Sequence, residues 1–155
     1  MNDACQAIEE IVHRETRAWD TQDVDLLLSV LHPDMVWPWP PHADAHDPLE
    51  WELVLGRYDR TRWRRGWQEL FDTHHLVRNE RALRRVVVAA EGDGGFAVVD
   101  VDTRWRHRVT GVEQHWIGRA CKIYTTVGGE WKMIAQTGLL SYRLHPAGGA
   151  GGATG

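Results

Sequence analysis

Two β-rich runs of this chain meet at Gly128-Gly129, and this junction restricts the possible folds more than any other feature. The runs extend over His115–Val127 and Trp131–Tyr142. Gly-Gly between two such runs is typical of a two-residue β-hairpin turn, because glycine adopts positive φ at both turn positions. The sequence therefore predicts a long antiparallel hairpin near its C-terminal end.

The turn also predicts a register. With a two-residue turn Val127 lies opposite Glu130, and alternate side chains then share one face of the hairpin. We interpret one face as the wall of a pocket, because it combines apolar side chains with side chains that can bind or react. Its candidate site residues are His115, Arg119, Cys121, Ile134, Gln136 and Tyr142. A slip by one residue would place Trp116, Lys122 and Tyr124 in the pocket instead.

The N-terminal half of the chain has helical periodicity. Apolar residues at spacings of three and four predict a helix over about Ala4–Trp19, and Asp23 is a candidate N-cap for a short second helix. The same spacing predicts a third helix over Thr61–Thr73. Glu15 lies on or beside the apolar stripe of the first helix, so it is either a solvated flanking residue or a buried acid in a pocket.

The rest of the chain is predicted to form strands. A short strand at Met35–Trp37 ends at Pro38, and longer strands follow over Arg81–Glu91 and Phe96–Val109. Helices followed by an antiparallel meander predict an α+β fold, with about three helices covering one face of a curved sheet. We expect one domain over residues 1–145 and a disordered Gly/Ala tail over residues 146–155.

Composition limits the partners. A net charge of −4 in 155 residues favours neither nucleic acid nor an anionic membrane as a partner. No apolar run approaches the length of a membrane span and no secretory signal is recognisable, so we expect a cytoplasmic protein. His42 and His46 lie in a proline-flanked loop, and no phosphate-binding glycine loop is present, so we predict no metal and no cofactor.

Nine tryptophans are the unusual feature of the composition. A tryptophan ring buries a large apolar surface and carries an N–H group that needs an acceptor. Several of the nine therefore either line an amphipathic pocket or form the core and a dimer contact. The candidates for the pocket wall are Trp19, Trp37, Trp39, Trp63 and Trp67.

Four segments resemble one family of folds. They are Ala18-Trp19-Asp20, Asp23-Val24-Asp25, Leu31–Trp37 and Gly129–Ile134. Together they resemble the cone-shaped fold shared by nuclear transport factor 2, ketosteroid isomerases, scytalone dehydratase and the SnoaL-like polyketide cyclases. The likeness extends over about Ala4 to Tyr142. It implies a pocket between the concave sheet face and the helices, and a homodimer formed across the sheet.

The active-site pattern of the isomerases does not carry over. The resemblance places the isomerase tyrosine at Glu15, the general-base aspartate at Trp39 and the hydrogen-bonding aspartate at Cys121. None of the three residue types matches. Ketosteroid isomerisation with those residues is therefore disfavoured, because it needs a base and a donor for the enolate. The same alignment turns Cys121 and Ile134 toward the cavity.

The leading hypothesis is a cofactor-free dehydratase, isomerase or cyclase for a hydrophobic small molecule, aromatic or polycyclic. His115 would move the proton and Arg119 would stabilise negative charge, with Glu15 or Asp34 orienting them. A non-catalytic binding or assembly module of the same fold is the alternative. A small subunit of an aromatic-ring dioxygenase is a third possibility.

Overall fold

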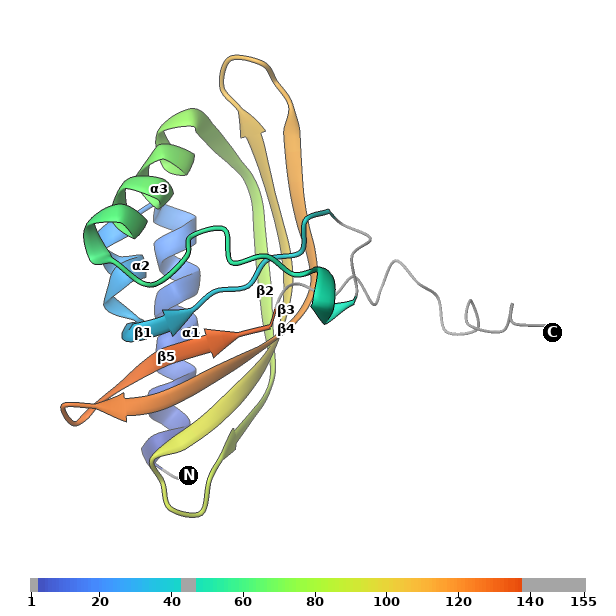
Figure 1. Cartoon of the computed structure of the whole chain (residues 1–155). Helices are drawn as coiled ribbons and strands as arrows, with labels where there is room; N and C mark the ends of the chain where they lie inside the picture. Colours follow the sequence, from blue (N-terminus) through green and yellow to red (C-terminus); the bar gives the residue numbers. More distant parts are fainter. Residues whose placement is uncertain (1–2, 43–46, 138–155) are drawn as a thin grey trace, which may run out of the picture.

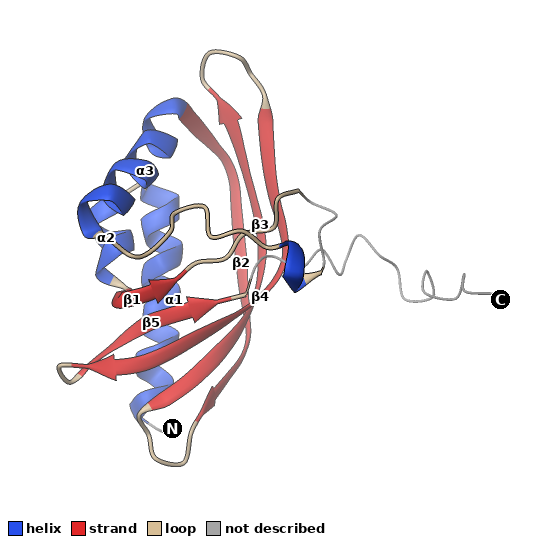
Figure 2. Ribbon diagram, in the orientation of Figure 1, coloured by secondary structure: helices blue, strands red, loops and turns tan. Residues whose placement is uncertain are grey.

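The computed structural model describes residues 3–42 and 47–137, in which three helices lie on one side of a curved sheet (Figures 1 and 2). The helices are α1 (Asp3–Thr21), α2 (Val24–Ser29) and α3 (Arg60–Thr73), and a 3-10 turn, η1, covers Pro48–Glu50. The predicted α+β class is confirmed. None of the helices in these two described ranges is long and apolar enough to cross a membrane.

The sheet has five strands in the order β1-β5-β4-β3-β2. Their bounds are β1 (Leu31–Val36), β2 (His74–Val88), β3 (Gly94–His107), β4 (Glu113–Val127) and β5 (Glu130–Gln136). The neighbours β2, β3, β4 and β5 pair antiparallel, and β1 pairs with β5 in parallel. The long strands bend around the helices, so the helices face the concave side (Figure 1).

The helices form where the sequence patterns predict them. The buried side chains of α1 recur every three or four residues, from Ile8 to Trp19, and contact the sheet. Asp23 is the N-cap of α2, where its side chain accepts a hydrogen bond from Leu26 N at 3.0 Å. Asp59 has the same role for α3, with Arg62 N at 2.8 Å.

Two strands begin earlier than predicted. β1 starts at Leu31 rather than Met35, because parallel pairing with β5 extends it; Met133 N donates to Val30 O at 2.8 Å. Pro33 is tolerated because β1 is an edge strand. β2 begins at His74, directly after α3, because its first residues pair with the end of β3.

The predicted hairpin is present, but the face that it turns toward the helices is the opposite of the predicted one. Val127 pairs with Glu130 as expected, and a β-bulge between Tyr124 and Ile123 then shifts the register by one. As a result Gln136 pairs with Lys122 and not with Cys121. The side chains turned toward the helices are Ala120, Lys122 and Tyr124, all buried, whereas His115, Arg119 and Ile123 are on the outer face.

Gly95 at the start of β3 is a point of very close packing. A Cβ there would lie 2.5 Å from Val87 O and 2.9 Å from Ile8 Cδ1 of α1. We expect Gly95→Ala to lower the free energy of unfolding by about 1–3 kcal/mol, because backbone and helix must shift. Gly94→Ala is the control, since its Cβ would meet only Tyr124 O at 3.9 Å among the described neighbours. Equal urea midpoints for the two variants would contradict the close packing.

Candidate functional site

A cluster of buried charges lies between α1 and the concave face of the sheet. Glu15 of α1 and Lys122 of β4 are 1% and 2% exposed. Lys122 Nζ lies 2.7 and 2.8 Å from the two carboxylate oxygens of Glu15 and donates to Gln136 Oε1 at 3.1 Å. Arg81 of β2 adds a third charge, with Nη1 at 3.2 Å from Glu15 Oε1. Charged side chains are seldom this buried unless they are paired as here.

Neighbouring residues hold the Glu15 and Arg81 side chains in place. The indole N–H of Trp19, one turn along α1, donates to Glu15 Oε1 at 3.2 Å. The guanidinium of Arg81 lies over the Trp19 ring at 5.3 Å, and its Nε donates to Asn79 Oδ1 at 2.9 Å. Thr103 of β3 donates to the same Asn79 oxygen at 2.8 Å. The carboxylate therefore accepts hydrogen bonds from one helix and two strands.

Burial and charge act in opposite directions on the titrating groups. Burial alone would raise the pKa of Glu15, but Lys122 and Arg81 outweigh it and hold this pKa below its ordinary value. Burial lowers the pKa of Lys122 in spite of the attraction of Glu15. Burial also raises the pKa of Tyr124, on the same face of β4, well above its ordinary value. Glu15 is thus ionised at neutral pH, and Lys122 is a stronger acid than a lysine in water.

Beside the charges the site is lined with tryptophan. Trp19 makes edge-to-face contacts with a set of rings drawn from several elements: Trp37, Trp67, Phe71, Trp105 and Trp116. Next to this cluster lies an apolar hollow of about 200 Å³, walled by Trp37, Trp39, Val54, Leu55, Trp67, Gln114 and Trp116. We call this space the tryptophan hollow.

A recess of about 20 Å³ adjoins the hollow at the charged cluster. Its wall contains Glu15, Arg81, Lys122 and Gln136, and it shares Trp37, Trp39 and Trp116 with the wall of the hollow. A volume of this size accommodates about one water molecule or one small polar group. The tryptophan hollow and the recess together can therefore take an apolar ring at one end and an oxygen at the other.

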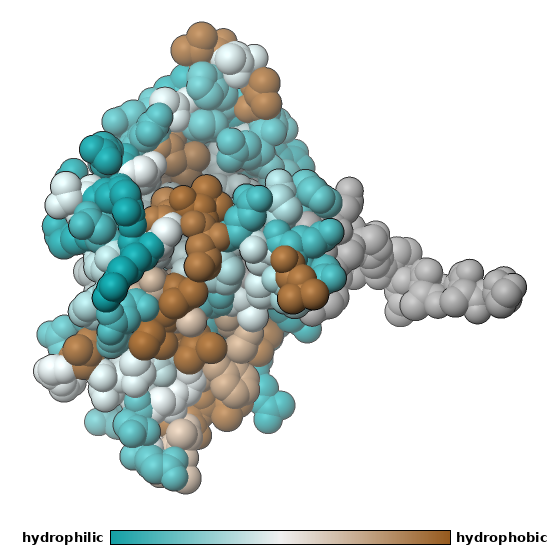
Figure 3. Space-filling view, viewed as in Figure 1, coloured by the Kyte–Doolittle hydropathy of each residue, from teal (hydrophilic) through white to brown (hydrophobic). Residues whose placement is uncertain are grey.

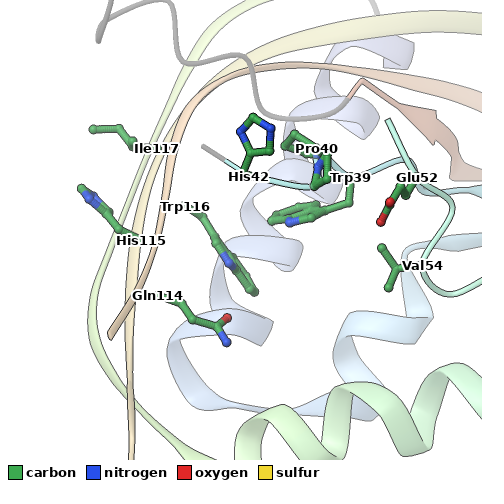
Figure 4. Close-up of a pocket in the computed structure, with 10 residues that line it drawn as sticks. Trp39, Pro40, His42, Glu52, Val54, Gln114, His115, Trp116 and Ile117 are labelled. Atoms are coloured by element: carbon green, nitrogen blue, oxygen red, sulfur yellow. The ribbon is translucent and has the colours of Figure 1, made fainter. Parts of the chain in front are cut away.

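The hollow opens outward into a mouth of about 430 Å³ (Figure 4). Trp39 and Trp116 meet edge-to-face there, with ring centroids 5.0 Å apart. Backbone hydrogen bonds of 2.8 Å in both directions join Trp39 to Glu52, so the segment after η1 forms one side of the mouth. Figure 3 shows hydrophobic side chains gathered where this segment crosses the surface, and Leu53 and Val54 are 56% and 69% exposed.

The structure does not place His115 and Arg119 at the buried charges. His115 Nε2 lies 2.8 Å from Asp102 Oδ1, and the ring points away from Trp39 and Trp116 in Figure 4. Arg119 Nε lies 2.8 Å from Asp100 Oδ1. Both contacts are on the outer face of the sheet, so the predicted orientation of Arg119 into the pocket is wrong. His115 lines only the outer mouth and neither the hollow nor the recess. The physical reason is that β4 turns its even-numbered residues inward.

Four other predicted residues also lie away from the charges or cannot be placed. Asp34 is exposed on β1, and Cys121 lies half-buried on the outer side of β4, so its predicted orientation is also wrong. Ile134 is the additional residue of the bulge and does not line the hollow or the recess. Tyr142 lies outside the described residues.

The remaining predicted residues do lie near one another. Glu15 and Gln136 belong to the charged cluster, and of the two alternatives for Glu15 the buried one is confirmed. Trp19, Trp37, Trp39 and Trp67 line the recess or the hollow. Trp63 instead packs in the core, where its N–H donates to Leu55 O at 3.1 Å.

Three residues of the site were not among the predicted site residues. Lys122, Arg81 and Trp116 all line the recess. The position of Lys122, between Ala120 and Tyr124 on an alternating strand, was the available signal, because those neighbours favour burial. No comparable signal marks Arg81, which lies among other charged residues in the sequence.

The sheet is curved and five-stranded, and its concave face holds the three helices and the tryptophan hollow. This arrangement is the NTF2-like fold class. Within this class the chain belongs to the SnoaL-like domain family, whose model matches residues 12–134. Among proteins with curated descriptions, none matches this chain in sequence.

Solved structures agree with this assignment. A ketosteroid isomerase-like protein from Erwinia carotovora atroseptica superposes with a TM-score of 0.66 at 16% identity, over 91% of this chain and 99% of that one. A putative aromatic ring hydroxylase from Novosphingobium aromaticivorans gives 0.64 at 18% identity, over 89% and 88%. A putative scytalone dehydratase from the same organism gives 0.61 at 12% identity, over 86% and 80%. Identities this low establish the fold alone.

Proposed function

We propose that this protein is a cofactor-free enzyme of the isomerase or dehydratase type, which binds a small ring compound in the tryptophan hollow and moves a proton on it. The observation that carries this proposal is the buried Glu15–Lys122 pair beside the hollow. Ionisable groups with shifted pKa values in a cleft are typical of catalytic sites. The proposal replaces His115 and Arg119 by Lys122 and Arg81, and it keeps Glu15.

The geometry of Glu15 supports a role as base. Lys122, Arg81 and Trp19 all donate to Oε1, whereas Oε2 accepts from Lys122. A substrate oxygen in the recess would take the hydrogen bond of Lys122 away from Oε2. Oε2 would then be free to accept a proton from the carbon next to the substrate carbonyl, and Lys122 would stabilise the enolate oxygen.

The proton has a complete route in either reaction. In an isomerisation Glu15 returns the proton to a different carbon of the same molecule. In a dehydration the C–O bond of a hydroxyl group breaks, Lys122 protonates the departing oxygen to give water, and Glu15 then returns the first proton to Lys122. Both routes end with Glu15 ionised and Lys122 protonated, as at the start.

We expect the protein to accelerate the exchange of α-protons of 2-tetralone in D₂O, measured by proton NMR. This ketone has an apolar ring system and an acidic carbon, so exchange reports proton abstraction whatever the natural product is. Glu15→Gln should reduce the acceleration at least about 100-fold, because the base is lost. Glu113→Gln is the matched control, since Glu113 pairs with Arg106 on the exposed surface. Exchange by Glu15→Gln at the wild-type rate would refute the role of Glu15.

A binding module without catalysis is the second candidate. It is favoured by one observation: Trp19, Arg81 and Lys122 already donate to the two oxygens of Glu15, and only about 20 Å³ is open beside it. Binding of 2-tetralone without any acceleration of exchange by the wild type would select this candidate.

The homodimer implied by the resemblance stays a prediction. The outer face of the sheet would form its interface. Phe96 and Ile123, paired across β3 and β4, are 37% and 45% exposed on that surface.

A further inference from the structure

Two donors in the wall of the tryptophan hollow have no described acceptor. The indole N–H groups of Trp37 and Trp67 are buried, and neither donates a hydrogen bond to any residue in 3–42 or 47–137. The two rings contact each other at 5.0 Å and both line the hollow. A buried N–H group without an acceptor destabilises the fold. Because both N–H groups are buried, a ring must turn slightly to bring its N–H to an acceptor on a molecule in the hollow, and that hydrogen bond would remove the cost.

The recess has unbalanced positive charge. Lys122 and Arg81 carry two positive charges against the single carboxylate of Glu15, and the exposed fractions of these three side chains are 3%, 6% and 2%. Asp20 is a further acid that attracts Arg81, but it is solvent-exposed and accepts a hydrogen bond from Asn79 Nδ2 at 2.8 Å. Water screens an exposed carboxylate strongly, so it offsets little of the charge inside. A negative oxygen in the recess would be stabilised by the remaining positive charge.

The hydrogen-bonding groups of the recess are biased toward donors. The Glu15 oxygens accept from Lys122, Arg81 and Trp19, and the Gln136 oxygen accepts from Lys122. The acceptors of the recess are thus in use within the protein. Among the groups of the hollow, the indole N–H groups of Trp37 and Trp67 remain to be satisfied.

We infer that the ligand is a flat compound of one or two rings that carries a single negative charge on an enolate, phenolate or carboxylate oxygen, with hydrogen-bond acceptors elsewhere on the molecule. The anionic oxygen occupies the recess beside Lys122, and the rings occupy the hollow within reach of Trp37 and Trp67. Neutral and cationic compounds with the same rings bind less tightly. This inference rests on the proposed function, because it assigns the polar end of the molecule that the hollow binds.

Three probes with one ring system test the charge preference. They are 2-naphthoate, 2-naphthamide and 2-naphthylmethylamine, whose polar groups are anionic, neutral and cationic at pH 7. Isothermal titration of the full chain with each probe gives the dissociation constants. We expect 2-naphthoate to bind at least about tenfold more tightly than 2-naphthamide, and the amine to bind most weakly.

Two variants then test which residues cause the preference for the anionic probe. Lys122→Met should bring the affinities for 2-naphthoate and 2-naphthamide to within about twofold of each other, because the positive charge at the recess is halved. Trp37→Phe keeps a ring but removes the N–H, so it should weaken 2-naphthoate about five- to tenfold. If Lys122→Met does not fold, Trp37→Phe still tests the inference. Trp105→Phe is the matched control, since its N–H is also buried without a described acceptor but its ring lines neither the hollow nor the recess.

The outcomes separate the two proposals. Preference for 2-naphthoate in the wild type, with a loss in Trp37→Phe that Trp105→Phe does not share, supports the inference. Equal affinity for the three probes overturns it and leaves the proposed function standing. If Trp37→Phe and Trp105→Phe weaken the binding of 2-naphthoate equally, the indole N–H of Trp37 is not a donor to the ligand. Failure of all three probes to bind overturns both the inference and the proposed function.

Discussion

Replacing Lys122 with methionine should lower the free energy of unfolding by about 3–5 kcal/mol. The substitution keeps much of the apolar stem but removes the partner of a carboxylate that is 1% exposed. Arg81 and Trp19 still donate to Glu15 Oε1, but Oε2 loses its donor at 2.8 Å and remains buried. A buried charge without its partner is among the most destabilising features that a single substitution can create.

Urea denaturation followed by circular dichroism measures this effect. Lys132→Met is the control on the adjacent strand, because Lys132 is 20% exposed, pairs with the 73% exposed Glu130 at 3.2 Å and donates to Ser29 O at 2.7 Å. We expect that control to cost about 1–2 kcal/mol, because it loses a hydrogen bond but leaves no buried charge without its partner. The double variant Glu15→Gln with Lys122→Met should recover part of the loss, since it removes both charges. A single variant as stable as the control would mean that the buried pair is not formed in solution.

Replacing Trp19 with alanine should cost about 3–5 kcal/mol, the range for deleting a large buried side chain. Trp19 is 1% exposed, and its ring contacts five other aromatic rings. Its removal leaves a cavity among rings that cannot all move inward, and Glu15 loses one hydrogen bond. We therefore expect the largest fall in thermal stability of any single tryptophan variant at the site.

Trp39→Ala provides the comparison. Trp39 is half-buried at the mouth, where it contacts Trp116, and its pairing with Glu52 uses backbone atoms that alanine keeps. Its loss should cost about 1–2 kcal/mol, because its site is already open to water. Calorimetric melting of the two variants tests the contrast. Similar melting temperatures would contradict a central position of Trp19 in the core.

The elements of the fold were predictable because their signals are local. The spacing of apolar residues in α1, the cap Asp23 and the Gly-Gly turn each act within a few residues of sequence. The pairing of Val127 with Glu130 followed directly from the turn. β1 was predicted too short because its parallel partner, β5, comes about a hundred residues later in the chain.

The site was less predictable because its key contacts are between distant residues. A lysine on a strand is normally solvated, and Lys122 is buried only because Glu15, 107 residues earlier, lies opposite it. His115 and Arg119 resemble a catalytic pair in the sequence. In the structure they instead pair with Asp102 and Asp100 on the outer face of the sheet.

The amino-acid sequence by itself determined the order of helices and strands and the hairpin turn, since periodicity, capping and turn chemistry depend on neighbouring residues. Only the tertiary structure decided which face of β4 lines the hollow. A strand presents two faces that differ by one residue, and the bulge beside Tyr124 shifts the pairing of β4 with β5 by that same amount. The packing of α1 against the sheet then brought Glu15 to Lys122, because a charge is stable in a core only where its counter-charge is also buried.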